Sequence, residues 1–204
     1  MTDLQIALLS AGAGLVGSII GVAGSWLSIW LQKMANASGR ISVHTRIVYS
    51  KWNKKTWGVE RNDEGQLFFH IPIWVDICNT SNMPQIVRDL NVYGYKNHRE
   101  VAIFTQAQGS GKEENYFVYA NNGAYTFVIP PNSACRFNLE FSLKQSEVES
   151  EDRDFDELIL AYYDNKNRFK RFKFIEIQDA WAIGERPRVK QWKTMDCEVK
   201  YRGN

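Results

Sequence analysis

An uncharged run near the amino terminus, residues 6–31, constrains this chain more than any other feature of its sequence. As an α-helix this run would be about 39 Å long, which exceeds the roughly 30 Å of hydrocarbon in a bilayer. Trp26 and Trp30 gather at one end, where amphipathic rings favour the headgroup region, and Lys33 follows directly. We therefore predict a single transmembrane helix in residues 1–34, with these three side chains as its interface anchors.

Small side chains recur along the run at spacings of 3, 4, 3, 4, 3 and 4 residues. They are Ala7, Ser10, Gly14, Gly17, Gly21, Gly24 and Ser28. At about 100° per residue they share one helix face, although each glycine costs a helix roughly 0.8–1 kcal/mol relative to alanine. In lipid, such a stripe permits close packing against another helix. The stripe predicts an oligomerisation face with a second copy as partner; the alternative is that small residues are simply common in membrane helices.

The charges that flank the run predict its orientation. Residues 33–55 hold six basic residues and no acidic one, whereas the amino-terminal flank holds no basic residue. By the positive-inside rule, the following domain is cytoplasmic, and we expect the inner or plasma membrane of a bacterium. The alternative is a cleaved signal peptide that ends at "ANA", residues 35–37. The missing positive charge in the first five residues and the length of the apolar run oppose that alternative.

Beyond a polar linker at residues 35–40, the pattern changes to the period-two alternation of β-strands over residues 41–180. The stretch "LFFHIPIWVDICN" places every second residue, from Phe69 to Ile77, on one apolar face. About eight such segments, separated by turn signals, predict a mainly β fold. Among them, "ISVHTRIVY" places every second residue from Ile41 to Tyr49 on one face. The stretch "NYFVYANNGAYTFVIPPNS" is expected to form two strands about "NNG", and residues 158–177 a hairpin that turns at "DNKN". We expect an antiparallel β-sandwich, immunoglobulin-like, with a Greek-key barrel as alternative. The "IPPNS" corner and the "NTS" strand exit resemble many immunoglobulin-like modules of bacteria.

Residues 181–204 form a basic, aromatic tail, in which Trp181 and Trp192 predict docking against a sheet edge of this chain or of a neighbour. Three cysteines, at positions 78, 135 and 197, are too few for a disulfide scaffold and favour a reducing compartment. The first two are spaced like an immunoglobulin bridge, but the accompanying tryptophan and tyrosine are missing. The net charge of +2 disfavours a dedicated nucleic-acid binder.

Catalytic and metal-binding signatures are missing from the sequence. The three histidines, His44, His70 and His98, have no metal-ligand spacing among themselves or with the cysteines. The acidic run at 146–157 fails the calcium-loop pattern, because Glu157 and Tyr163 stand where glycine and glutamate are required. We expect no cofactor, no metal and no enzymatic activity, with an unrecognised hydrolase as a minor alternative.

The stretch "NKNRFKRFKF", residues 165–174, interleaves basic and aromatic side chains. Such a strand is typical of contacts with phosphates or with anionic lipid headgroups. The alternative is that its charges pair with the acidic run before it. The candidates for anion or lipid contact are Lys166, Arg168, Lys170, Arg171 and Lys173.

Together these observations predict a single-pass, membrane-anchored protein without enzymatic activity. It would oligomerise through the glycine-rich helix face and present a cytoplasmic β-sandwich to an unknown protein or small ligand. The alternative function is an oligomeric, pore-forming membrane effector gated by the sandwich, for example in bacterial defence.

Overall fold

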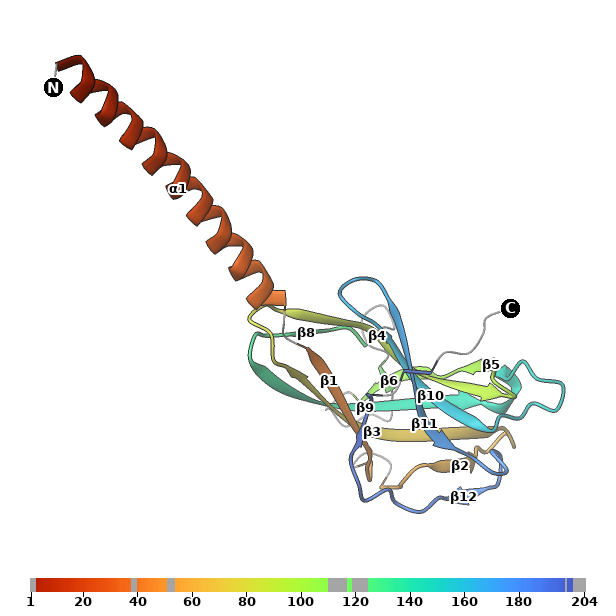
Figure 1. Ribbon diagram of the computed structural model, residues 1–204. Helices are drawn as coiled ribbons and strands as arrows, with labels where there is room; N and C mark the ends of the chain where they lie inside the picture. The colour runs from red at the N-terminus through yellow and green to blue at the C-terminus, as the bar shows by residue number, and fades with distance from the viewer. Residues whose placement is uncertain are drawn as a thin grey trace. The chain divides into compact units, whose positions relative to one another are not determined.

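The computed structural model describes residues 3–37, 40–50, 54–109, 117–118, 125–196 and 198–199 of the chain. Two compact units divide the chain, Met1–Gly39 and Arg40–Asn204. The first is a single helix, and the second is built of β-strands in two sheets (Figure 1).

Helix α1 runs without interruption from Asp3 to Ala37. Two of its serines donate their hydroxyl hydrogen to the carbonyl one turn back, from Ser18 to Gly14 and from Ser25 to Gly21, both at 2.8 Å. Their polar groups are thereby satisfied within the helix itself. Large apolar side chains of α1 are exposed throughout residues 16–34.

No helix in the part of the chain that the structure describes is long and apolar enough to cross a membrane. The described part of α1 includes Gln32 and Lys33 as well as several glycines and serines, which lower its apolar character. The prediction of a helix in this part of the chain is confirmed by α1. The membrane span that we predicted in residues 1–34 gains no support from the structure and stays a prediction.

Eight of the described strands form a larger sheet in the order β12-β2-β3-β9-β6-β7, with β1 paired to both β3 and β13. Their bounds are β1 (Ile41–Ile47), β2 (Gly58–Arg61), β3 (Leu67–Asn79), β6 (Thr105–Gly109), β7 (Phe117–Val118), β9 (Ser133–Lys144), β12 (Gly184–Glu185) and β13 (Lys193–Thr194). A short 3₁₀ helix, η2 (Gln145–Glu147), follows β9.

Five described strands form a smaller sheet in the order β11-β10-β4-β5, with β8 also paired to β4. Their bounds are β4 (Gln85–Lys96), β5 (Arg99–Ile103), β8 (Phe127–Ile129), β10 (Glu157–Tyr163) and β11 (Phe169–Glu176). Every strand pairing in both sheets is antiparallel. The prediction of a mainly β fold with an antiparallel sandwich is confirmed.

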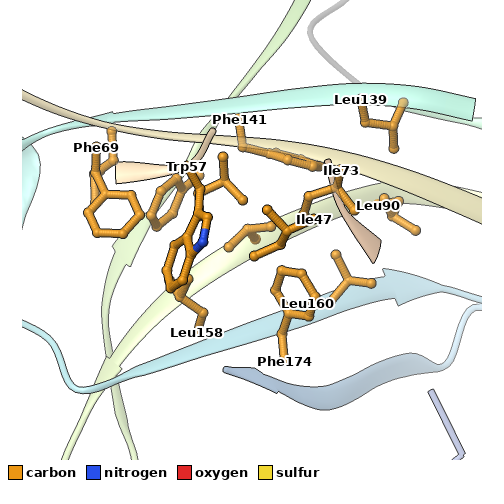
Figure 2. Close-up of a cluster of buried hydrophobic side chains, with 14 of the residues drawn as sticks. Ile47, Trp57, Phe69, Ile73, Leu90, Leu139, Phe141, Leu158, Leu160 and Phe174 are labelled. Atoms are coloured by element: carbon orange, nitrogen blue, oxygen red, sulfur yellow. The ribbon is translucent and has the colours of Figure 1, made fainter. Parts of the chain in front are cut away.

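The core lies between the two sheets, as Figure 2 shows. Alternate residues of a strand point to opposite faces of its sheet, so the odd-numbered side chains of β3 from Phe69 to Ile77 face inward and are fully buried. They meet Leu158 and Leu160 of β10 from the opposite sheet. Burying apolar side chains of this size contributes about 1.5–3 kcal/mol each and holds the two layers together.

The two described cysteines lie on neighbouring strands of the larger sheet and are free. Cys135 of β9 is opposite Ile77, and Cys78 of β3 is opposite Ala134. This offset of one residue sends the two side chains to opposite faces of the sheet. Their spacing in the sequence therefore does not correspond to the bridge between sheets of an immunoglobulin domain. Cys197 lies outside the described residues.

The carboxy-terminal segment adds short strands to the larger sheet and touches the smaller one. Strand β12 pairs with β2, β13 pairs with β1, and Glu198 forms a bridge to Phe172 of β11. At the β12 contact, a Cβ atom on Gly58 would lie 2.1 Å from the carbonyl oxygen of Gly184. Only glycine fits there, and its φ of +154° also disfavours other residues.

Candidate functional site

The outer face of the smaller sheet carries a hydrophobic cluster of its own, separate from the core. Tyr93 and Tyr95 of β4 and Ile159 and Ala161 of β10 form it, and Phe169 of β11 packs against them. These residues alternate with Val92, Leu158 and Leu160, which face the core. Ile159 and Ala161 are fully buried although they lie on the outside of the sandwich. The tyrosine and phenylalanine rings therefore cover the sheet where another layer would otherwise be needed.

Two arginines extend this aromatic face. The guanidinium of Arg88 lies 5.9 Å from the ring centre of Tyr163, and that of Arg171 lies 5.9 Å from the ring centre of Phe169. The two rings are themselves 4.8 Å apart. Arg88 also donates to the Asn167 side chain. Within the described part of the chain, neither arginine forms an ion pair with a carboxylate.

The hydroxyls of Tyr93 and Tyr95 remain protonated at neutral pH. Burial raises the pKa of Tyr93 and of Tyr95 above the usual value of 10. Tyr95 donates to Glu100 at 3.3 Å and also hydrogen-bonds Arg171. Each hydroxyl is therefore a neutral group that can both donate and accept a hydrogen bond.

Flat faces of tyrosine and arginine are typical of the energetically important centres of protein interfaces. We name this set the aromatic–arginine face: Arg88, Tyr93, Tyr95, Tyr163, Phe169 and Arg171. The exposed Ile103 of β5, opposite Tyr93 and 55% accessible, extends it toward the sheet edge. Of the set, only Arg171 and Phe169 belong to the basic–aromatic stretch predicted to contact anions. The signal was present in "VYGY" and "AYY", where tyrosines alternate with inward-facing residues.

The five basic residues predicted to contact anions or lipids all lie in or beside β11, but most have carboxylate partners. Arg168 pairs with Asp164 at 2.6 Å, Lys170 with Glu198 at 2.5 Å, and Lys173 with Glu157 at 2.7 Å. Lys173 also pairs with Glu176 at 2.6 Å, and these contacts raise its pKa. Lys166 is exposed at the β10–β11 turn, and Arg171 belongs to the face above. The anion-contact role stays a prediction.

The predicted oligomerisation stripe lies along α1. A Cβ atom added at Gly14, Gly17, Gly21 or Gly24 would meet nothing within 4 Å, and Ser28 is exposed. The side chains of Ala7 and Ser10 lie outside the described residues. The predicted anchors Trp26, Trp30 and Lys33 are all exposed. The oligomerisation role of the stripe stays a prediction.

His70 belongs to a buried polar cluster on the outer face of the larger sheet. Its Nε2 lies 3.9 Å from the Glu140 carboxylate, which accepts a 2.5 Å hydrogen bond from the Ser50 hydroxyl. Burial lowers the pKa of His70, while Glu140 opposes this shift. The carboxylate lies between serine and histidine, so this arrangement lacks the nucleophile–base contact of a catalytic triad.

The other candidates for chemistry have ordinary partners. The Nδ1 of His44 lies 3.0 Å from the Thr194 hydroxyl, and the exposed His98 lies 3.7 Å from Glu157. In the acidic run, Lys96 pairs with Asp152 and with Asp154. Among the residues with a described placement, no three histidine, cysteine or acidic side chains gather as a metal site would require.

Comparisons with known proteins identify the β-structured unit. A search of curated proteins gave no significant match. A sequence model described as the YopI Ig-like domain matches residues 39–175, which includes most strands of both sheets. Because the matched region covers more than half of the chain, this protein belongs to the family of the YopI Ig-like domain.

Proposed function

We propose that this chain is a membrane-anchored recognition protein that oligomerises through α1 and binds a partner protein through its immunoglobulin-like domain. The aromatic–arginine face is the observation that carries this proposal. It combines buried tyrosine rings with two arginines that have no carboxylate partner among the described residues. Stacked guanidinium groups and neutral tyrosine hydroxyls can hydrogen-bond a partner at little entropic cost, because their rings are already fixed by packing.

Anchoring is supported by the uncharged run at residues 6–31 and by its continuous helical conformation. The internal hydrogen bonds of Ser18 and Ser25 suit an environment without water, because each hydroxyl needs no outside partner. The basic flank at residues 33–55 favours a cytoplasmic position for the domain.

Oligomerisation is supported by the recurrence of Gly14, Gly17, Gly21 and Gly24 on one face of the continuous helix α1. A second helix could approach the bare backbone closely there, and close packing is the main force between helices in lipid. Bringing several domains together would also raise the apparent affinity of each aromatic–arginine face for a multivalent partner.

The recognition proposal is tested by photo-crosslinking from two matched positions in cells. Tyr163 lies on the aromatic–arginine face, and Trp74 lies on the outer face of the larger sheet. Each is replaced in turn by a photoreactive phenylalanine derivative. We expect a discrete crosslinked protein from position 163 that is lost in Arg171→Glu, and no such product from position 74. Equal products from both positions, or persistence in Arg171→Glu, would contradict the proposal.

The anchoring and oligomerisation proposals are tested by carbonate extraction of membranes followed by crosslinking in mild detergent. We expect the chain to stay with the membrane, and Gly17→Leu and Gly21→Leu to run as smaller species than the wild type. Val22→Leu is the matched control because it changes size off the stripe. Wild-type size for both glycine variants would remove the oligomerisation role. Leakage of dye from vesicles carrying the chain would instead favour the pore-forming alternative.

A further inference from the structure

One end of the immunoglobulin-like domain is the place where the chain enters it from α1. The main chain of Arg40 accepts from the Thr80 amide at 3.1 Å and donates to the Thr80 hydroxyl at 3.1 Å. The Asn132 amide donates to Ser81 at 3.0 Å. We call this the entry end: Arg40, the loop of residues 80–84 and the corner of residues 130–132. The first residues of β1, β4 and β9 and the last of β3 and β8 meet there (Figure 1).

A buried asparagine makes the entry end rigid. The Asn79 amide donates to the carbonyls of Met83, Ile129 and Pro130 at 2.9, 3.1 and 2.9 Å. Its oxygen accepts from the amide and the hydroxyl of Ser81 at 2.9 and 2.7 Å. The buried Asn79 side chain thus uses both its nitrogen and its oxygen in hydrogen bonds, and these bonds fix the conformation of the loop. Apolar side chains that this rigid end exposes to solvent therefore stay exposed.

Three such apolar side chains are exposed at or beside this end. Met83 in the loop is 52% accessible, and Ile86 of β4 and Val128 of β8 are 36% and 64% accessible. Ile86 and Val128 are directly opposite each other in the sheet and so share one surface. A rigid surface that exposes methionine, isoleucine and valine together is suited to an apolar environment.

The charges of the domain are distributed unevenly between its two ends. The segments that lead to the entry end, residues 40–47, 77–88 and 126–139, contain no acidic residue and include Arg40, Arg46, Arg88 and Arg136, of which Arg136 is paired with the adjacent Asp76. The exposed Lys166 lies at the same end, because Tyr163, just before its turn, pairs with Arg88 near the start of β4. Three loops at the opposite end, residues 60–66, 96–99 and 145–157, contain ten acidic residues and four lysines or arginines.

We propose that the entry end lies on an anionic lipid surface, with Met83, Ile86 and Val128 at the headgroup–acyl boundary and Arg40 and Lys166 at lipid phosphates. This inference depends on the proposed anchoring through α1, because the anchor would bring this end of the domain to the bilayer. Apolar side chains ringed by cations bind anionic interfaces by burial and by charge together. The acidic loops of the opposite end would be repelled by the same surface.

The test uses the full-length chain in vesicles of phosphatidylcholine with phosphatidylglycerol, after carbonate washing. In a background where the three native cysteines are alanine, Met83→Cys carries an environment-sensitive fluorophore, and lipids brominated near the headgroup act as quenchers. Ile183→Cys is the matched control, because Ile183 is 59% accessible and bridges Val59 of β2, near the opposite end. We expect emission to be lost at position 83 and unchanged at position 183.

Loss of quenching at position 83 in Arg40→Glu/Lys166→Glu, but not in the control Arg61→Glu, would support the contact of Arg40 and Lys166 with the lipid phosphates. Equal emission at positions 83 and 183 in carbonate-resistant protein would overturn the inference while leaving the anchoring intact. Removal of the protein by the carbonate wash would instead overturn the anchoring, and the inference with it.

Hydrogen exchange of the unmodified chain gives a second measurement. We expect slower exchange of the amides of residues 80–84 in vesicles with phosphatidylglycerol than in vesicles without it. An equal rate in both would count against the proposal.

Discussion

The two sheets of the sandwich differ in what covers their outer faces. On the larger sheet, segments of the chain itself provide the cover. The guanidinium of Arg136 of β9 lies 5.1 Å from the ring centres of both Trp74 and Trp192, and it makes two 2.7 Å hydrogen bonds to Asp76. Through Trp192, the carboxy-terminal segment thus reaches over this face.

On the smaller sheet, the outer cluster consists only of residues from the sheet itself, within the part of the chain that is described. Its arginines stack on aromatic rings and have no acidic partner there. The same residue types thus have different uses on the two faces. On the larger sheet, charge and aromatic rings close the fold, whereas on the smaller sheet they remain available for a partner. Substitutions on the two faces should therefore separate stability from binding.

The largest effect on stability is expected from Glu140 on the larger sheet. Glu140→Ala removes the acceptor of the Ser50 hydroxyl and the negative charge beside His70. Losing a buried hydrogen-bond partner of this kind costs about 1–3 kcal/mol, so we expect the free energy of unfolding to fall by that amount. Urea unfolding measures it, with Glu140→Gln as the matched control that keeps an acceptor. An equal loss in both variants would show that charge, not hydrogen bonding, matters here.

The next effect is a dependence of stability on pH through His70. Burial lowers the pKa of His70 in the folded chain below its usual 6.5, despite the nearby Glu140. As the pH falls through 6.5, His70 binds a proton in the unfolded chain at a higher pH than in the folded chain. The free energy of unfolding therefore decreases toward acid pH. One such proton gives a slope of at most about 1.4 kcal/mol per pH unit.

Unfolding measured between pH 7.5 and 5 for His70→Gln should show a shallower loss than the wild type. His44→Gln is the control, because His44 lies against Thr194 at the surface. If the two variants follow the same curve, His70 does not carry the dependence.

A smaller effect is expected from Trp192, which covers the larger sheet from the carboxy-terminal segment. Trp192→Ser removes one of the two rings that lie against the Arg136 guanidinium. A cation–π contact at a partly exposed site contributes about 0.5–1 kcal/mol, which sets the expected loss in the free energy of unfolding. Limited proteolysis should also cut residues 186–194 faster than in the wild type. Unchanged cleavage would show that β13 alone holds the segment in place.

The strands of this domain could be predicted from the sequence because one face of each is buried. Alternation in "LFFHIPIWVDICN" identified the inward side chains of β3 correctly. The turn at "DNKN" is also confirmed, since β10 pairs with β11 around it. Tyr49 was expected to continue the inward face of residues 41–49 but is 40% accessible, because β1 ends at Ile47.

Strand pairing was harder to predict, because periodicity does not show which strand lies beside which. We expected "NYFVYANNGAYTFVIPPNS" to form two strands about "NNG", which itself lies outside the described residues. Instead β7 pairs with β6, and β8 pairs with β4. The alternative that the basic strand pairs with the acidic run at 146–157 is confirmed for Lys173, which pairs with Glu157. The pair between Lys170 and Glu198 was not predicted, because these two residues are distant in the sequence.

The smallest effect on stability is expected from Arg171 on the smaller sheet, and it is the sharpest test of the contrast between the faces. Arg171 stacks on Phe169 and hydrogen-bonds Tyr95, and both of these rings also pack against the other residues of the outer cluster. Arg171→Ala should therefore change the free energy of unfolding by no more than about 0.5 kcal/mol, as is usual for surface substitutions.

The same Arg171→Ala variant should abolish the crosslink from position 163, because a partner would lose a preoriented, bidentate donor. Lys170→Ala is the matched control: Lys170 is the neighbouring cation and is already paired with Glu198. If Arg171→Ala destabilises the domain as much as Glu140→Ala does, both faces serve the fold, and the smaller sheet has no surface set aside for recognition.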